Sequence, residues 1–366
     1  MSEGDITEEK GEKVIREKAA KPRPKKSAAV SRAPLKTGVA NITVVGVGGG
    51  GCNTVMRLHQ EHPEGMNFVC CNTDVKALQS IRGDNIIILP IGETLTRGFG
   101  AGGDPKIGEQ AAASANKALE QVLTGSDIVF VCTGLGGGTG TGAAPVVAQI
   151  AKSVGALTVA MVTLPFQWEG HRRMETAISG LARLRESVDN VIMVHNDLMA
   201  SLVPASATMA EAFRITDETV TEGIMVVNEV VNQPGEINVD LADVKAILGL
   251  PGEALMSIGQ GSGKDAAQQA AENAIKNPLL DISIEGAKGV LFTVKGGPQL
   301  TLAQVNMAGR KISQAVDPDA MIFFGMSLKS GMEDKVRITV IATGIPEGQS
   351  KAKQVKAQAP RSAIIS

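Results

Sequence analysis

Short apolar runs alternate with helical patterns through the first half of the chain. Six such runs follow Asn41: Ile42–Val47, Asn67–Cys71, Asn85–Leu89, Asp127–Cys132, Leu157–Leu164 and Asn190–Val194. Between them, Ala111–Leu123 and Ala143–Ser153 have the apolar spacing of helices. Alternating strands and helices predict an α/β fold, in which helices cover both faces of a parallel sheet.

A longer helical pattern, residues 208–233, separates this half from the rest of the chain. Thr208 and Glu211 have the spacing of a capping box, and Pro234 follows the last helical position. Apolar residues recur between these ends with the helical period: Met209, Phe213, Val220, Ile224, Val227 and Val231. Farther on, helix patterns at Asp265–Lys276 and Leu302–Val316 alternate with strand patterns at Gly289–Val294, Met321–Ser327 and Val336–Ala342. These elements predict a second, smaller α/β domain.

The two ends of the chain lack hydrophobic periodicity and carry a basic excess. Residues 1–38 contain 10 Lys and Arg against 6 Asp and Glu, and residues 347–366 contain 4 against 1. We therefore predict a disordered basic tail over 1–38 and a flexible tail over 347–366. Three parts lie between the tails: a first domain (39–207), a central helix (208–233) and a C-terminal domain (234–346).

Charge and cysteine content narrow the function classes. The body of the chain, residues 39–346, has 22 basic and 31 acidic residues, so we expect no nucleic-acid partner. The acidic start is not a signal peptide, and no run of 18 apolar residues is present, so we expect no direct transmembrane insertion. The four cysteines have no CxxC spacing, which predicts a reduced, cytoplasmic protein without disulfides or zinc.

A glycine-rich segment, Gly46 to Asn53, follows the first strand pattern and opens a helix. Glycines let the backbone approach an anion closely, and the start of a helix offers unpaired N–H groups. The spacing of Gly46, Gly48 and Gly51 also fits the dinucleotide-binding fingerprint. Asp74 stands where that fingerprint places a ribose-binding acid. An NAD-dependent oxidoreductase is therefore one interpretation of this half of the chain.

A second glycine-rich segment, Gly134–Gly142, follows the strand pattern that ends at Cys132. It contains six glycines and two threonines in nine residues and again opens a helix. No Lys follows the glycines of either segment, so neither is a Walker P-loop. A dehydrogenase needs one phosphate loop, whereas two loops at neighbouring strand ends favour a longer phosphate chain with a metal ion.

Residues 136–142, GGGTGTG, resemble the signature loop of the tubulin/FtsZ family. Further motifs of that family appear in order: GVGGGGCN at 46–53, Asn72–Asp74, Gly100–Gly102, Pro165–Gly170, Asn196–Asp197 and Asn238–Asp243. The resemblance implies a Rossmann-like parallel-sheet GTPase domain, a long central helix and a smaller α/β C-terminal GTPase-activating domain. It also implies a GTPase that converts GTP to GDP and phosphate with Mg²⁺. Members polymerise head to tail into cytoskeletal filaments of the cell-division ring.

The resemblance also implies which residues hold GTP. The two loops would hold the phosphates through Gly49, Gly50, Gly51, Cys52, Asn53, Gly136, Gly137, Gly138, Thr139 and Gly140. The other implied positions are Glu169 and Arg173 at the ribose and phosphate, Asn196, and Phe213 and Asp217 at the base. A carboxylate suits guanine because it can accept from N1–H and the N2 amine together.

Some of these residues have plainer interpretations outside the family context. Glu169 and Arg173 would be an exposed pair one helical turn apart, and Phe213 would be a core residue. Cys52 stands where many relatives have a smaller or amide residue, so we expect thiol sensitivity at this position.

The catalytic acids that the resemblance implies are Asp240 and Asp243, with Asn238 in the same loop. Asp240 is also in position simply to cap the helix that follows it. Asp217 and Gln233 lie sixteen residues apart on the central helix, about 24 Å along its axis. The acids beyond that helix therefore cannot reach the nucleotide of their own subunit, and we expect them to act on the GTP of the next one. Such a head-to-tail contact generates an open filament. No metal site of the chain itself is predicted, since no protein ligand for Mg²⁺ stands out.

The sequences of the two tails do not identify a binding partner other than a second copy of the chain. Residues 347–366 lack the acidic–Pro–aromatic peptide by which bacterial members dock membrane anchors, which points to an archaeal-type member. We expect membrane-anchoring or division proteins to bind through the tails, and a cytoplasmic location at the mid-cell division site. A family member that uses GTP as a regulator or scaffold, without forming division rings, is the remaining alternative.

Overall fold

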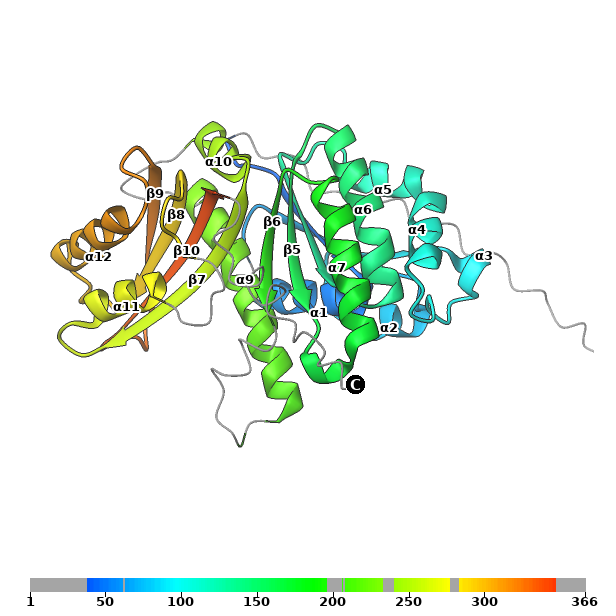
Figure 1. The fold of residues 1–366 in the computed structure, drawn as a ribbon, viewed down its shortest axis with the longest axis horizontal. Coiled ribbons are helices and arrows are strands. Elements are labelled where there is room, and N and C mark those ends of the chain that lie inside the picture. Colours follow the sequence, from blue (N-terminus) through cyan, green and yellow to red (C-terminus); the bar gives the residue numbers. More distant parts are fainter. Residues whose placement is uncertain are drawn as a thin grey trace, which may run out of the picture. The chain divides into compact units, whose positions relative to one another are not determined.

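The chain folds around a ten-stranded sheet with the order β3-β2-β1-β4-β5-β6-β7-β10-β8-β9 (Figure 1). This computed structural model describes residues 38–61, 63–195, 206, 208–232, 240–276 and 283–346. No helix within those ranges is both long enough and apolar enough to cross a membrane.

The first six strands run parallel in the order of a dinucleotide-binding domain. They are β1 (Ile42–Val47), β2 (Met66–Asn72), β3 (Ile86–Pro90), β4 (Ile128–Gly134), β5 (Leu157–Leu164) and β6 (Asn190–His195). Their helices are α1 (Gly48–Gln60), α2 (Val75–Gln79), α3 (Glu93–Thr96), α4 (Pro105–Ser114), α5 (Asn116–Leu123), α6 (Gly138–Ser153) and α7 (His171–Arg185), with a 3₁₀ turn η1 (Gln167–Glu169). The predicted α/β class is confirmed.

Alternate residues of the strands enter two separate cores. Val44 of β1 packs with Val55 and Leu58 of α1 on one face of the sheet. Its neighbour Val45 packs on the other face, in the cluster that contains Val147 of α6. Helices cover both faces of the sheet, so a ligand has access mainly to the carboxyl ends of the strands. Sheets of this kind commonly bind nucleotides there.

Helix α9 (Met209–Asn232) connects this domain to the rest of the fold. It begins with the predicted capping box: the Thr208 N–H donates to Glu211 Oε2 at 2.6 Å, and the Glu211 N–H donates to the Thr208 hydroxyl at 3.3 Å. Its buried residues, among them Val220 and Ile224, share one core with strands of both halves of the sheet. The predicted helix end at Gln233 lies outside the described residues.

The remaining elements form the smaller domain. They are α10 (Leu241–Leu248), β7 (Glu253–Ser262), α11 (Ala266–Ile275), β8 (Gly289–Gly296), α12 (Leu302–Ala315), β9 (Met321–Leu328) and β10 (Lys335–Ile345). Strand β10 runs antiparallel to β7 and β8, and β8 runs parallel to β9. One bridge, Ile192 to Ala254, joins β6 to β7 and so connects the two halves of the sheet.

Two elements differ from the sequence prediction. The single helix expected over Ala111–Leu123 is two helices, α4 and α5, which are separated at Ala115. Strand β7 is not predicted by the pattern, because Gly259 and Gly261 weaken its strand signal. Both glycines serve packing, since a side chain at either position would collide with the backbone of α11.

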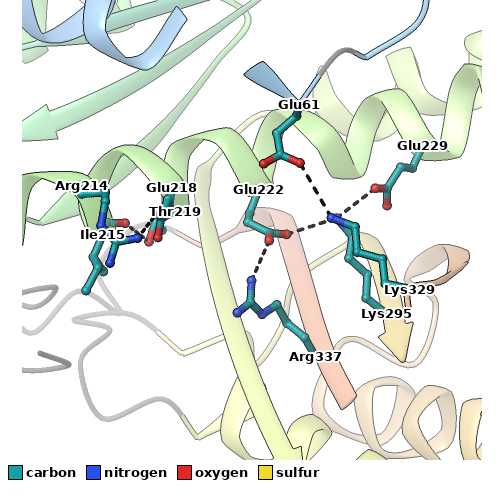
Figure 2. A network of polar contacts seen from close by, with 10 residues as sticks. All are labelled: Glu61, Arg214, Ile215, Glu218, Thr219, Glu222, Glu229, Lys295, Lys329 and Arg337. Atoms are coloured by element: carbon teal, nitrogen blue, oxygen red, sulfur yellow. Dashed lines mark hydrogen bonds and ion pairs between the residues drawn. The ribbon is translucent and has the colours of Figure 1, made fainter. Parts of the chain in front are cut away.

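A buried lysine joins α9 to the smaller domain (Figure 2). Lys295 of β8 is 5% exposed. Its Nζ lies 3.2 Å from Glu222 Oε2 and 2.9 Å from Glu229 Oε1, both on α9. Arg337 of β10 also pairs with Glu222, at 2.8 Å. These ion pairs fix the middle and the end of α9 against β8 and β10.

Candidate functional site

The two glycine-rich loops meet at the carboxyl ends of β1 and β4, which pair directly. A side chain at Gly51 would collide with the carbonyl oxygen of Cys132. A Cβ at Gly48, whose φ is +73°, would lie 3.0 Å from the Gly140 nitrogen. The loops therefore pack backbone against backbone, as only glycine permits.

Each loop opens a helix whose first N–H groups receive no side-chain cap. Val47 is the N-cap residue of α1 and Gly137 that of α6, and neither makes a side-chain capping bond. A Cβ at Gly49 or at Gly137 would meet no atom within 4 Å, so open space lies beside both backbones. Unpaired N–H groups and the positive end of each helix dipole favour an anion there, which makes this edge of the sheet a candidate phosphate site.

Two further segments complete this edge, and neither was among the predicted GTP-binding residues. The Thr73 hydroxyl, just after β2, lies 2.6 Å from the Thr139 hydroxyl. The glycine loop before α4 lies against the second phosphate loop. A Cβ at Gly138 would be 2.8 Å from the Ala101 Cβ and 2.9 Å from the Asp104 nitrogen. Gly138 is therefore required by the packing of the chain itself, whatever it does for a ligand.

Glu169 and Arg173 form an ion pair beside the second loop. Arg173 Nε lies 3.1 Å from Glu169 Oε2, and Glu169 also accepts the Phe166 N–H at 2.9 Å. The Glu169 side chain is only 11% exposed, so this is not a plain surface pair. A Cβ at Gly136 would lie 2.8 Å from Arg173 Cγ, which places the arginine stem against the signature loop.

Asp217 reaches from α9 to α1. Its Oδ1 lies 3.2 Å from the Thr54 hydroxyl, and its Oδ2 lies 3.6 Å from a terminal nitrogen of Arg57. The Thr54 hydroxyl also lies 3.3 Å from the Gly50 carbonyl oxygen, so the carboxylate stands one helical turn from the first loop. Burial raises the pKa of Asp217 to about 6, an effect that Arg57 and Thr54 oppose. The group is therefore mainly ionised at neutral pH.

Three aromatic rings cluster at the start of α9, near Asp217 in the sequence. Phe213 precedes Asp217 by one turn of α9, and its ring is partly exposed. It meets Phe166 edge to face at 5.4 Å between centroids, and Phe166 in turn stacks on Trp168. An exposed ring next to a carboxylate suits a planar base with polar edges, so Phe213 is not the plain core residue that its helical spacing alone indicates.

Cys52 lies near the start of α1, and its side chain packs against the ends of β1 and β2. The thiol is buried, 3.6 Å from the Gly46 carbonyl oxygen. A hydrogen bond with Cys70 and burial raise its pKa well above the usual range. Burial and the raised pKa both disfavour the reactive thiolate, so they argue against the expected thiol sensitivity of the folded chain. Asn53, the next predicted residue, is exposed on α1.

The predicted catalytic acids lie at the opposite edge of the sheet. Helix α10, which contains Asp243, is held there by two contacts. Lys245 Nζ lies 3.9 Å from Asp127 Oδ1, and Asn190 Nδ2 donates to the last carbonyl of the helix at 3.0 Å. Asp127 and Asn190 stand at the amino ends of β4 and β6. In Figure 1, α10 lies at the top, where the arrows of β5 and β6 begin, and α1 lies near their heads.

Asp240 occupies the N-cap position of α10 but makes no side-chain bond to that helix. The capping role that its position permits is therefore not realised. Both Asp240 and Asp243 are exposed, so their carboxylates are open to another molecule. Asn238 and Asn196, the two other predicted site residues of these segments, lie outside the described ranges.

In the part of the chain that the structure describes, no group of three or more His, Cys, Asp or Glu side chains is placed to hold a metal ion.

Comparisons with known proteins agree with this geometry. Residues 41–204 match the GTPase domain of the Tubulin/FtsZ family, and residues 252–346 match the C-terminal domain of the FtsZ family. The chain is 43% identical to FtsZ in an empty dimer from M. jannaschii, with a TM-score of 0.79 over 83% of this chain and 88% of that one. A protofilament of CetZ2 from Haloferax volcanii, with GTPgS bound, is 21% identical over 87% of this chain and 97% of that one, with a TM-score of 0.71. The second likeness concerns the fold alone.

Proposed function

Because the chain belongs to the tubulin/FtsZ family and is therefore a GTPase, we propose that it assembles head to tail and hydrolyses GTP between subunits. The FtsZ of M. jannaschii described above was solved as a dimer, which supports self-association. The chain would then be a polymerising cytoskeletal GTPase.

One observation carries this proposal: the phosphate loops and the exposed acids stand at opposite ends of the parallel strands. Strand β4 alone spans seven residues, about 20 Å, between these edges. Asp240 and Asp243 are therefore too far from the phosphate loops of their own subunit. Stacking copies in one orientation would bring them to the loops of the next copy, and such a contact repeats without closing.

The residues of each edge would then have distinct roles. The N–H groups of α1 and α6 hold the phosphates and stabilise negative charge that develops on them. Asp217 and Phe213 hold the guanine, and Glu169 with Arg173 borders the ribose and phosphate. Asp240 and Asp243 of the neighbouring subunit polarise the attacking water. Mg²⁺, when bound, offsets charge on the phosphate oxygens.

The NAD interpretation of the first loop loses its support. It rested on Asp74 as a ribose-binding acid, but Asp74 Oδ1 accepts the Ala77 N–H at 3.1 Å and caps α2. The family of the chain is one of GTPases, and the second phosphate loop has no place in a dehydrogenase.

The cellular role rests on the family. We place the filament in the cytoplasm at the mid-cell division ring, with membrane-anchoring or division proteins bound through the tails. A scaffold that uses the same site without a division role is the alternative, and the location of the protein in dividing cells separates the two.

The test of assembly-linked hydrolysis measures pelleting and phosphate release in one sample. Turnover per molecule should be negligible in dilute protein with GTP. It should then rise with protein concentration in step with the pelleted fraction. A rate per molecule that stays constant over the whole concentration range would contradict the proposal, because each subunit would then contain a complete site.

A further inference from the structure

We propose that Arg57 of α1 is a positioning residue for guanine: it keeps the Asp217 carboxylate ionised and oriented, so that the pocket selects this base at neutral pH. The inference rests on the proposed function, since it takes Asp217 as the group that contacts the base.

Both oxygens of the Asp217 carboxylate are engaged from α1. Thr54 Oγ1 lies 3.2 Å from Oδ1, and the Arg57 guanidinium lies 3.6 Å from Oδ2. An ionised carboxylate accepts about four hydrogen bonds, so each oxygen keeps a lone pair for a donor of the base. The two contacts therefore fix the plane of the carboxylate and leave its acceptors available.

The charge of Arg57 is directed mainly at Asp217. The Arg57 Nε is buried and has no hydrogen-bond partner among the described residues. Its only other ion pair in those ranges is a 4.0 Å approach to Glu218 Oε1. Glu218 has a closer partner in Arg214, at 2.6 Å, which Figure 2 shows on the same helix.

Without this cation, the surroundings of Asp217 would raise its pKa further, towards neutral pH. Burial raises the pKa of Asp217 to about 6, Arg57 and Thr54 act to lower it, and Glu218 acts to raise it. The thiol of Cys132 on β4, which interacts electrostatically with Asp217, is neutral because burial raises its pKa. A protonated Asp217 would present an O–H donor where guanine also presents N–H donors. Loss of the charge would therefore remove the match to the base.

The pH dependence of GDP affinity tests this role. In the wild type, affinity should rise as the pH rises through about 6, because binding below that value must release a proton from Asp217. In Arg57→Met the midpoint should move up by about one pH unit or more, since an opposite charge at this range shifts a carboxyl by that amount. Affinity would then be reduced near neutral pH and recovered in mild alkali.

Three variants serve as controls. Arg57→Lys retains the charge and should restore most of the wild-type midpoint. Arg214→Met removes a neighbouring cation that pairs with Glu218 rather than with Asp217, so the midpoint should move far less than in Arg57→Met. Asp217→Asn measures the pH dependence that remains without this carboxyl. This baseline is needed because the terminal phosphate of the nucleotide also titrates at about pH 6.

The possible outcomes separate the inference from the function on which it rests. Equal loss of affinity at every pH in Arg57→Met would show that Arg57 only shapes the pocket, and the inference would be wrong. The same midpoint shift in Arg57→Met and Arg214→Met would also overturn it. If the wild type bound no GDP at any pH, the proposed function itself would fail.

Discussion

Gly137 and Gly138 are neighbours in the second phosphate loop, yet a side chain would act differently at each. A Cβ at Gly137 meets nothing within 4 Å, and its φ of −95° with ψ of 177° is open to any residue. A Cβ at Gly138 meets Ala101 and Asp104 of the chain itself. Gly137 is thus the position where bulk affects the ligand and not the fold.

We expect Gly137→Val to remain folded and to lose GTP affinity by at least about tenfold, or 1.4 kcal/mol, because its side chain occupies the space beside the helix N-terminus. Equilibrium nucleotide binding measures the loss of affinity, and thermal unfolding shows whether the variant remains folded. Gly138→Val is the comparison, and it should lose stability as well. If Gly137→Val bound GTP with wild-type affinity, the prediction would be wrong, and the loop would be a tight turn that does not bind phosphate.

The sequence locates the loops of the site but not the side chains that complete it. Glycine runs after strand patterns are a local signal, so both loops could be predicted. Thr54 and Asp217 are 163 residues apart and meet only because α9 packs on α1, and no local pattern marks such a pair. The inward direction of Cys52 likewise follows from the packing of α1 and not from its place beside the glycines.

At the scale of elements, the packing of α9 against the smaller domain depends on ion pairs as well as on apolar contacts. Lys295 lies between Glu222 and Glu229, and burial raises the pKa of the Glu229 carboxyl. A buried ion pair of this kind contributes little by itself, but removing one partner leaves a buried charge without compensation. The carboxylates of α9 thus make the joint between the domains sensitive to this lysine.

Lys295→Met should lower the free energy of unfolding by about 3–5 kcal/mol, as measured by urea denaturation near neutral pH. The loss should shrink as the pH falls, because Glu222 and Glu229 then take up protons and no longer repel. Lys311→Met is the matched control, since Lys311 pairs with Glu272 at the surface and should cost less than about 1 kcal/mol. Equal effects of the two substitutions would mean that the buried network does not stabilise the joint.

Element boundaries could be predicted where local chemistry marks them. The capping box of Thr208 and Glu211 starts α9 where the sequence places it. The break between α4 and α5 at Ala115 has neither glycine nor proline, so the apolar period continues through it and predicts one helix. Strand β7 is not predicted, because its glycines weaken the local strand pattern. They are needed for the close packing of α11, a contact that is distant in sequence.

For the whole molecule, the proposed function requires each subunit to hold half of a hydrolytic site at either edge of its sheet. Part of this separation could be predicted, since the length of the central helix already keeps Asp217 far from the acids. The structure adds an independent reason: Lys245 and Asn190 hold α10 at the amino ends of the strands. How one subunit meets the next depends on surfaces that no motif describes.

The most direct test mixes two inactive variants and measures phosphate release. Asp240→Ala keeps the phosphate loops and lacks an acid, whereas Gly137→Val keeps the acids and lacks a phosphate site. Each alone should hydrolyse GTP slowly. In an equal mixture, about a quarter of the head-to-tail contacts join an intact loop to an intact acid. Turnover should therefore recover to about a quarter of the wild-type rate. No recovery in a mixture that forms joint filaments, or full activity of Asp240→Ala alone, would contradict a site shared between subunits.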